Sequence, residues 1–250
     1  MSYQTIQARF QEPVCFLRFN RPTINDLFIE ECHHVLAMCR ESTTVVVLEG
    51  LPEVFCLGAD FHGLHAKMTG GQQNEYNPEP LYDLWLKLAT GPYITVSHVR
   101  GKANAGGVGF VAASDIVLAD QTAQFSLSEL LFGLFPACVL PFLIRRMGFQ
   151  KANYMSLMTH PISVQQAHSW GLVDACDSQS DSLLRKHLLR LRRISKMGIT
   201  RYKSYLSQLN DSILKSKSLA VASNREVFSD PRNLERIFLF VEKGEFSWKD

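Results

Sequence analysis

Alternating apolar and polar residues predict that the chain begins with a β-hairpin. Residues 3–19 alternate on either side of Gln11-Glu12-Pro13, where the proline interrupts any helix. Residues 27–39 then carry apolar side chains at helical spacing. Residues 45–48 form a short apolar run, which is typical of a strand buried on both faces of a parallel sheet. The chain therefore passes from a hairpin to a helix and then to a buried strand.

Helices and strands continue to alternate through the middle of the chain. The pattern predicts a helix at residues 81–88, a strand at 93–99, a short apolar helix at 106–113 and a strand at 116–119. Strands that alternate with helices indicate right-handed crossovers and an α/β fold. The polar stretch at residues 68–80 is rich in Gly, Gln and Asn and has almost nothing to bury, so it predicts a mobile loop.

From residue 136 onward the pattern predicts almost only helices. The candidate segments are residues 140–147, 150–158, 163–170, 181–196 and 203–215. We therefore expect a C-terminal helical region. Basic residues interleaved with leucines mark residues 185–193, and this pattern favours a solvated helix face over a docking patch.

Composition narrows the class of protein. The 250 residues are 46% hydrophobic and 20% charged, which is enough apolar material for a full core in one domain. The net charge is only +2, so we expect no attraction to nucleic acid or to a membrane surface. The chain has no apolar run of the roughly 18 residues that a membrane span needs, and no signal-peptide pattern at its start. We expect a cytoplasmic protein.

The cysteines argue against a metal site or a disulfide framework. All six lie far apart in the sequence, without a C-x-x-C pair or a histidine at metal-binding spacing. They occupy positions 15, 32, 39, 56, 138 and 176. We therefore expect free thiols in a reducing compartment.

Two glycine-containing segments are candidates for binding a carbonyl oxygen. In residues 55–61, Gly58 permits a backbone conformation that aims the amide of Ala59 outward, although such a turn can also be a simple connection. In residues 100–110, small residues precede a predicted helix, whose first amides are unpaired and point at whatever anion or carbonyl lies there. Close helix packing explains these glycines equally well.

A phosphate-binding loop is the competing interpretation of the second segment. The sequence matches neither G-x-G-x-x-G with a downstream acidic residue nor G-x-x-x-x-G-K-[ST]. Lys102 precedes the glycines instead of following them. Nucleotide binding through this loop is therefore disfavoured.

Glu129 is the candidate acid or base. It is the only charged residue between Asp120 and Arg145, and its neighbours are strongly apolar. Partial removal from water is expected to raise its pKa toward neutral pH, as general acid-base chemistry requires. A structural carboxylate that caps a turn is the alternative, and the sequence leaves both open.

Taken together, these segments resemble the crotonase (enoyl-CoA hydratase/isomerase) superfamily along nearly the whole chain. The matching residues, in order, are Arg21-Pro22, Gly58-Ala59-Asp60, Gly101, Ala105-Gly106-Gly107, Asp115-Ile116, Ala123-Gln124-Phe125, Glu129, Ala167 and Trp170-Gly171-Leu172-Val173. The resemblance implies ββα repeats that form a spiral core over residues 1–190. It also implies a C-terminal helical trimerisation region at residues 191–250, a homotrimer or hexamer, and no cofactor.

The resemblance also implies roles for individual residues. The amides of Ala59 and Gly106 would form an oxyanion hole around a thioester carbonyl, and Glu129 matches one of the two glutamates of enoyl-CoA hydratases. Where such a hydratase carries its other glutamate, this chain has Gly109. Ordinary two-glutamate hydration of an enoyl-CoA is therefore not expected.

A closer resemblance is to the PksH-like dehydratases of polyketide assembly lines. It is carried by residues 45–56, 79–85 and 126–134. It implies a lyase that dehydrates 3-hydroxy-3-methylglutaryl on an acyl carrier protein, or on CoA, to 3-methylglutaconyl. One departure is that Arg21-Pro22 runs into Thr23-Ile24-Asn25 with fewer residues than the family usually has.

Three other functions compete with this one. They are decarboxylation of a 3-methylglutaconyl thioester, generic enoyl-CoA hydration or isomerisation, and a scaffold without activity that only binds an acyl carrier protein or RNA. The first uses the same oxyanion hole but needs no strong base. The last does not need Glu129 or the two oxyanion segments.

The branched substrate places further demands on the site. Gly109 is expected to leave room for the substituents on C3. A buried distal carboxylate needs a positive or hydrogen-bonding partner. The candidate partners near the polar stretch are His62, His65, Tyr82 and Lys87, although the sequence favours a surface position for each. Asp60 could orient water or the substrate hydroxyl, or hydrogen-bond its own turn.

Overall fold

The main sheet has six strands and begins with the hairpin expected from the sequence. In the computed structural model, which describes residues 3–69 and 76–244, the first two strands pair antiparallel and the others run parallel. The strands, in spatial order, are β1 (Ile6–Gln11), β2 (Val14–Phe19), β3 (Val45–Glu49), β5 (Ile94–Val99), β7 (Ile116–Ala119) and β10 (Ala175–Cys176). The strands expected at residues 45–48, 93–99 and 116–119 are confirmed.

The fold has a second sheet of four short strands, three of which directly follow strands of the main sheet in sequence. Its strands are β4 (Val54–Cys56), β6 (Lys102–Asn104), β8 (Gln124–Ser126) and β9 (Ile162–Ser163). Because β3 leads into β4, β5 into β6 and β7 into β8, the chain repeats two strands and a helical segment, as the spiral core requires. The sequence pattern did not show the second sheet, since strands of two or three residues are too short to display alternation.

Four helices connect the repeats on the N-terminal side. They are α1 (Asp26–Met38), α2 (Phe61–Thr69), α3 (Glu79–Thr90) and α4 (Gly106–Ala113). Asn25 begins α1 by accepting a hydrogen bond from the Phe28 amide. The helices expected at residues 27–39, 81–88 and 106–113 are confirmed, whereas α2 was not predicted. Residues 70–75 of the expected mobile loop lie outside the described residues.

The C-terminal half is mainly helical, as expected. Its helical elements are η1 (Glu129–Phe132), α5 (Leu140–Met147), α6 (Phe149–Met158), α7 (Val164–Ser169), α8 (Ser180–Leu191), α9 (Lys196–Leu209), α10 (Ser212–Lys215), α11 (Lys217–Ser229) and α12 (Pro231–Lys243). The single helix predicted at residues 181–196 is wrong, because Ser195 accepts a hydrogen bond from the Gly198 amide and starts a new helix. The segment predicted at 203–215 is also divided, at Asn210 and Asp211.

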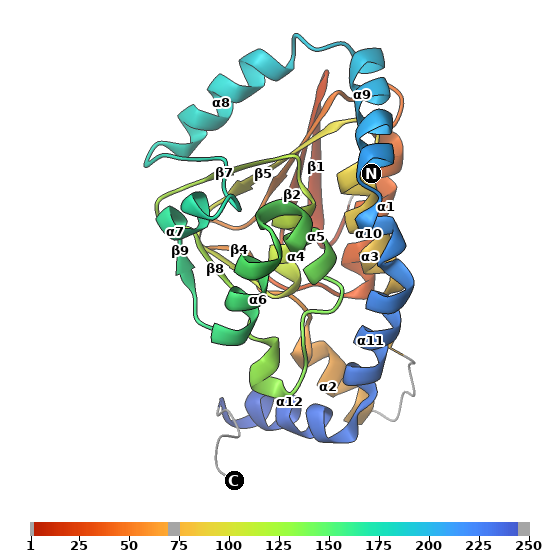
Figure 1. The fold of residues 1–250 in the computed structure, drawn as a ribbon, viewed down its shortest axis with the longest axis vertical. Helices are drawn as coiled ribbons and strands as arrows, with labels where there is room; N and C mark the ends of the chain where they lie inside the picture. The colour runs from red at the N-terminus through yellow and green to blue at the C-terminus, as the bar shows by residue number, and fades with distance from the viewer. Residues whose placement is uncertain (1–2, 70–75, 245–250) are drawn as a thin grey trace.

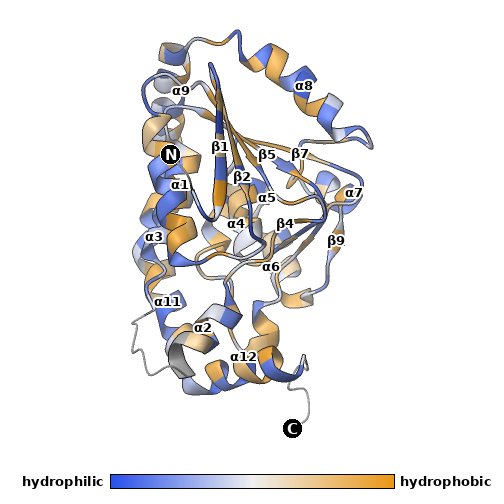
Figure 2. Ribbon diagram, turned by 180° about the vertical axis from the view of Figure 1, so that it is seen from behind, coloured by the Kyte–Doolittle hydropathy of each residue, from blue (hydrophilic) through white to orange (hydrophobic). Residues whose placement is uncertain are grey.

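The last helices return to the start of the fold. Figure 1 shows α9, α10 and α11 along one side of the molecule and α12 beside α2 at its end. Contacts join α10 to α5, α11 to α3, and α12 to both α2 and η1. Seen from behind in Figure 2, the helices carry hydrophobic and hydrophilic residues side by side, as amphipathic helices on a core do. The C-terminal helices therefore cover the chain's own α2, α3 and η1.

Aromatic side chains hold α3 and α4 together in the core. The Trp85 ring lies edge-on to Phe110 and to Phe142, each with ring centroids 5.9 Å apart. Phe19 packs on Phe110 and Phe28 in the same cluster. This packing holds α4 in place, and its N-terminal end faces the candidate site described below.

None of the described helices is long and apolar enough to span a membrane. The six cysteines are free, and five of them are buried. The basic residues of α8 are exposed while Leu184, Leu188 and Leu191 are buried, which matches the solvated helix face expected for residues 185–193.

Candidate active site

The turn after β4 leaves the amide of Ala59 free. The Ile24 amide donates to the carbonyl of Gly58 at 2.8 Å, and the Asp60 amide donates to the carbonyl of Ile24 at 3.0 Å. These two bonds secure the peptides on either side, so that Ala59 turns its own amide the other way. Among the described residues, the Ala59 amide has no hydrogen-bond partner. It is a fixed donor without an acceptor.

The start of α4 provides a second free amide. Gly106 is the first residue of α4, so its amide has no acceptor within the helix. Ala105, which precedes it, has a φ of 49° and a ψ of −120°, an unusual conformation for a residue with a side chain. Such backbone strain costs about 1 to 3 kcal/mol and is concentrated at functional sites. Such strain is typical of functional turns, so this turn is a candidate part of the site.

Glycines let the two amide-bearing segments touch. A Cβ atom on Gly58 would lie 2.9 Å from the Cβ of Ala105 and 3.0 Å from the nitrogen of Gly106. Gly58 also has a φ of 90°, which a side chain would disfavour. A Cβ on Gly107 would lie only 2.1 Å from the carbonyl oxygen of Cys56. The N-terminus of α4 can therefore lie directly against the end of β4.

Both segments open into one cavity of about 490 Å³. Ala59, Gly106 and Glu129 all line it, so the three residues predicted to act together are brought together. Its walls are largely apolar, with side chains such as Leu57, Trp85, Leu134, Phe135, Val139 and Phe228. Among the described lining residues, Glu129 is the only carboxyl group, and there is no lysine or arginine.

Glu129 is held at the first position of η1 with its side chain half-buried. Its Oε2 atom is fully enclosed and has no hydrogen-bond partner among the described residues. Burial raises the pKa of Glu129 to about 7, and hydrogen bonds from the backbone amides of Glu129 and Ser128 offset only part of that effect. The carboxyl can therefore gain or lose a proton near neutral pH.

A network of polar side chains joins the strands beneath Glu129. The Asn104 Nδ2 donates to the Ser128 hydroxyl at 2.9 Å, and the Ser126 hydroxyl donates to the Asn104 Oδ1 at 2.9 Å. Asn104 ends β6, Ser126 ends β8 and Ser128 precedes η1. The network thus fixes the segment that carries Glu129 relative to the start of α4.

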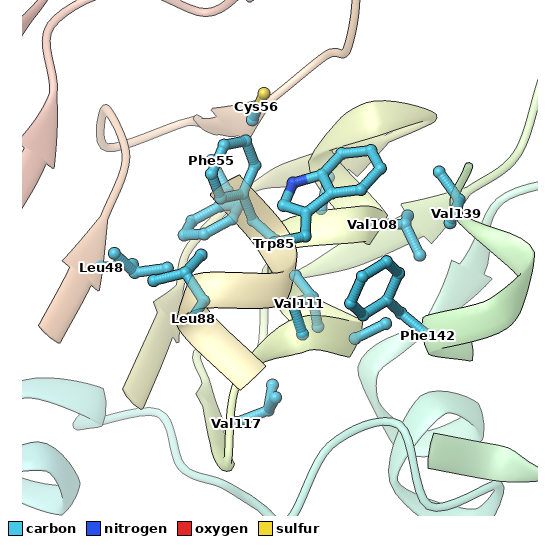
Figure 3. Packing of buried hydrophobic residues seen from close by; sticks show 14 of the residues in the cluster. Leu48, Phe55, Cys56, Trp85, Leu88, Val108, Val111, Val117, Val139 and Phe142 are labelled. Carbon is cyan, nitrogen blue, oxygen red and sulfur yellow. The ribbon is translucent and has the colours of Figure 1, made fainter. Parts of the chain in front are cut away.

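Gly109 does not leave open space for substrate, and that expectation is wrong. A Cβ on Gly109 would lie 2.4 Å from the Cζ2 atom of Trp85, because the indole ring lies directly over this glycine. Trp85 is buried, and Figure 3 shows it among core residues that include Phe55, Val108 and Phe142. Trp85 lines the cavity, whereas Gly109 does not. An indole therefore fills the space beside Gly109.

Tyr82 and Lys87 do not line the cavity, so the structure does not bring these two candidates together with Glu129. On α3, Leu81 and Trp85 are one turn apart and face the cavity, which turns the other two side chains elsewhere. Tyr82 is fully buried and donates from its hydroxyl to the carbonyl of Ile213. Lys87 is exposed in a separate groove.

The remaining candidates lie at the edge of the site. Asp60 forms an ion pair with Arg21 and accepts a hydrogen bond from the Gly63 amide at 3.1 Å, so it bonds its own turn beside an adjoining cavity. His62 lines the main cavity with an exposed side chain. His65 lies 3.3 Å from Glu242 and does not line the cavity.

Sequence reasoning missed the residues that distant segments bring to the cavity. The sequence points to Trp85 only through the family resemblance carried by residues 79–85. Tyr76, Asn224 and Phe228 also line the cavity, and Tyr76 stacks on Phe228 with ring centroids 4.4 Å apart. Nothing in the local sequence pattern of α11 distinguishes its cavity-facing residues. Their position depends on how the C-terminal helices return to the core.

Comparison with known proteins defines the family. The profile of the enoyl-CoA hydratase/isomerase family matches residues 9–250, and the chain belongs to that family. The chain is 61% identical over 255 residues to bacillaene synthase dehydratase PksH of Bacillus subtilis strain 168, covering 100% of this chain and 98% of that protein. It is 31% identical over 182 residues to 1,2-epoxyphenylacetyl-CoA isomerase of Escherichia coli K12, covering 67% and 68% of the two chains.

A solved structure agrees with this relationship. The crystal structure of the polyketide biosynthesis enoyl-CoA hydratase pksH from Bacillus subtilis superposes with a TM-score of 0.96 at 61% identity, covering 98% of this chain and 100% of that chain. The crotonase fold expected from the sequence is therefore confirmed. Among the described residues, no three His, Cys, Asp or Glu side chains are placed to hold a metal ion.

The contact between Trp85 and Gly109 predicts that the effect of Gly109→Ala on stability changes sign when Trp85 is replaced. Gly109→Ala should destabilise the protein by about 1 to 3 kcal/mol, since the added methyl group overlaps the indole. In a Trp85→Leu background the same change should be neutral or stabilising, because alanine favours a helix over glycine. Urea denaturation of the four proteins measures the coupling. Equal effects in both backgrounds would show that the two residues do not interact.

The burial of Glu129 predicts that its charge costs stability above neutral pH. The folded-state pKa of about 7 exceeds the ordinary value of 4.5, so stability is lost as the pH rises between these two values. Glu129→Gln should therefore be more stable than the wild type by about 1 to 3 kcal/mol at pH 8 and nearly equal to it at pH 4.5. Urea denaturation at both pH values tests this. A difference that does not change with pH would contradict it.

Proposed function

We propose that this protein is a dehydratase that removes water from 3-hydroxy-3-methylglutaryl on an acyl carrier protein and yields 3-methylglutaconyl-acyl carrier protein. The observation that carries the proposal is the cavity that joins Ala59, Gly106 and Glu129, in which Glu129 is the only carboxyl among the described lining residues. The 61% identity to bacillaene synthase dehydratase along the whole chain supports the same hydro-lyase reaction.

The first half of the reaction removes a proton from C2 of the acyl thioester. The Glu129 carboxylate accepts this proton, and the electron pair of the C–H bond moves onto the carbonyl oxygen as an enolate. The amides of Ala59 and Gly106 donate hydrogen bonds to that oxygen, where the negative charge accumulates. Loss of one such donor typically raises the barrier by roughly 3 to 4 kcal/mol.

The second half expels the hydroxyl group from C3. The protonated Glu129 returns its proton to the hydroxyl oxygen as the C3–O bond breaks, and the enolate electrons form the C2–C3 double bond. Water leaves, and Glu129 is again a carboxylate. One group that serves as base and then as acid needs a pKa near the working pH, and the value of about 7 meets that need.

The two competing reactions fit the cavity less well. Decarboxylation of a 3-methylglutaconyl thioester would use both amides but would not need a carboxyl whose pKa lies near 7. Hydration by two glutamates would need a second carboxyl at position 109, where the Trp85 ring leaves no room. The similarity to a dehydratase favours neither alternative.

An acyl carrier protein is the proposed partner, with CoA as a possible substitute. The relative with 61% identity is a dehydratase of bacillaene synthase, and polyketide synthases hold their intermediates on carrier proteins. The thioester itself supplies the activation, so no further cofactor is needed. Six free cysteines are compatible with work in the cytoplasm, which is a reducing compartment.

A turnover assay tests the reaction directly. Purified protein incubated with 3-hydroxy-3-methylglutaryl-acyl carrier protein should lower the mass of the carrier by one water. Glu129→Gln should slow turnover by at least ~100-fold, since it removes the group that carries the proton. Intact-protein mass spectrometry measures both. A wild-type protein that leaves the substrate unchanged would refute the proposal, as would a Glu129→Gln variant of normal rate.

Lys87→Gln provides the matched control. Lys87 belongs to the same helix as Trp85 but lies outside the cavity, so this variant should turn over at the wild-type rate.

In the wild type, kcat/KM should rise with pH through about 7, because the first step needs the carboxylate form of Glu129.

We propose that the protein works as a trimer or as a pair of trimers. The α6 helix exposes Phe149, Tyr154, Leu157 and Met158, each at least 50% accessible, and such apolar faces mark interfaces. The C-terminal helices, assigned to trimerisation from the family resemblance, pack on their own chain at α10, α11 and α12. Light scattering should give three or six times the chain mass of 28.3 kDa. A monomer at micromolar concentration would contradict the proposal.

A further inference from the structure

Asn224 is a buried polar residue in the cavity wall, and no contact within the protein explains its side-chain oxygen. It lies on α11, its exposure is 7%, and it lines the same cavity as Glu129. Its Oδ1 atom is enclosed and has no hydrogen-bond partner among the described residues. A buried amide without a partner lowers stability, so an asparagine that served only packing would be replaced by an apolar residue at a gain.

The packing of α11 holds Asn224 toward the cavity. Ala220, Asn224 and Phe228 follow one another at intervals of one helical turn and therefore share a face. The carbonyl of Ala220 accepts a weak hydrogen bond from the Cys138 thiol at 3.6 Å, and Phe228 stacks on Tyr76. Both neighbours on this face are thus anchored to residues that line the cavity.

The other asparagine in the cavity wall has no free capacity of this kind. Both ends of the Asn104 carboxamide are engaged, one by Ser126 and one by Ser128. In Asn224, by contrast, the Oδ1 atom has no hydrogen-bond partner among the described residues. Its terminal torsion is roughly two-fold, so a half-turn can present either the oxygen or the nitrogen to the cavity. Asn224 is therefore the side-chain amide available to a ligand.

The elimination proposed above calls for such an acceptor. When Glu129 donates its proton to a lone pair of the C3 hydroxyl, the hydroxyl's own hydrogen must point elsewhere, and burying it unpaired is unfavourable. A carboxamide oxygen can accept that hydrogen. The substrate's distal carboxylate cannot be the partner of the Asn224 Oδ1, because an ionised carboxylate has no hydrogen to donate.

We propose that Asn224 is a positioning residue that accepts a hydrogen bond from the C3 hydroxyl and turns the departing oxygen toward Glu129. This inference rests on the proposed dehydration. As the C3–O bond breaks, the hydroxyl gains the proton held by Glu129 and becomes water. The original hydrogen of the hydroxyl stays on the water and keeps its hydrogen bond to the Asn224 oxygen. The C-terminal helices thus contribute directly to recognition of a hydroxylated substrate.

The test compares two ligands that differ only in the hydroxyl group. In a Glu129→Gln background, which prevents turnover, binding of 3-hydroxy-3-methylglutaryl-acyl carrier protein and of 3-methylglutaryl-acyl carrier protein is measured by calorimetry. Adding Asn224→Leu should weaken binding of the first ligand about 10-fold, as loss of one hydrogen bond predicts. Binding of the second ligand should be unchanged. Equal weakening of both ligands, or of neither, overturns the proposal.

Asn233→Leu is the matched control. Asn233 is also 7% exposed and lies on the neighbouring helix α12, but its Nδ2 donates to the carbonyl of Val227 at 3.0 Å. This variant should lower the thermal midpoint and leave the preference for the hydroxylated ligand intact. Asn224→Leu should not lower the thermal midpoint. A fall in midpoint for Asn224→Leu as large as that for Asn233→Leu shows a structural asparagine and overturns the proposal.

Kinetics with Glu129 intact separate this inference from the proposed function. Asn224→Leu should reduce kcat by about 10-fold or more and leave the apparent pKa of the pH profile in place, because Glu129 is unchanged. Rescue by Asn224→Asp is not expected, since a second carboxylate in the same apolar cavity would repel the charge of Glu129. If the wild type does not dehydrate the substrate, the proposed function fails. The binding comparison then still decides whether Asn224 binds the hydroxyl group. If neither ligand binds, both the proposed function and the role of Asn224 are overturned.

Discussion

The close approach of α4 to the end of β4 is the constraint on which the site depends. Gly107 lets the helix lie against the Cys56 carbonyl, and Gly58 lets the next turn pass beside Ala105. A side chain at either glycine would push apart the two segments that carry the free amides. The strain at Ala105 is tolerated because core packing around α4 holds the helix from the other side. The placement of the two free amides is thus a product of backbone packing.

Glu129 gains its chemistry from the apolar wall that surrounds it. No lysine or arginine among the described lining residues offsets its charge, so burial raises its pKa to about 7. Trp85 takes the space over Gly109 and so contributes both to the core and to the cavity wall. A single carboxyl in such a wall suits a reaction in which one proton is taken up and then returned.

The C-terminal helices α11 and α12 form part of the cavity wall. They bring Phe228 onto Tyr76 and place Asn224 among the lining residues. The contacts of α12 with α2 and η1 tie this cover to the segments that bear Ala59 and Glu129. Part of the cavity wall therefore comes from a region that is distant in sequence from Ala59 and Glu129.

The sequence by itself determined the hairpin, the main strands, most helices and the isolation of Glu129 in apolar surroundings, because these follow from local periodicity and composition. The sequence did not predict the helix boundary near residue 195 or the short strands of the second sheet. A capping hydroxyl and strands of two or three residues produce almost no periodicity of hydrophobic and polar residues. Only the tertiary structure decided that Trp85 fills the space over Gly109 and that Tyr82 turns away. A local pattern tells which residues share a helix face, but long-range packing decides what that face meets.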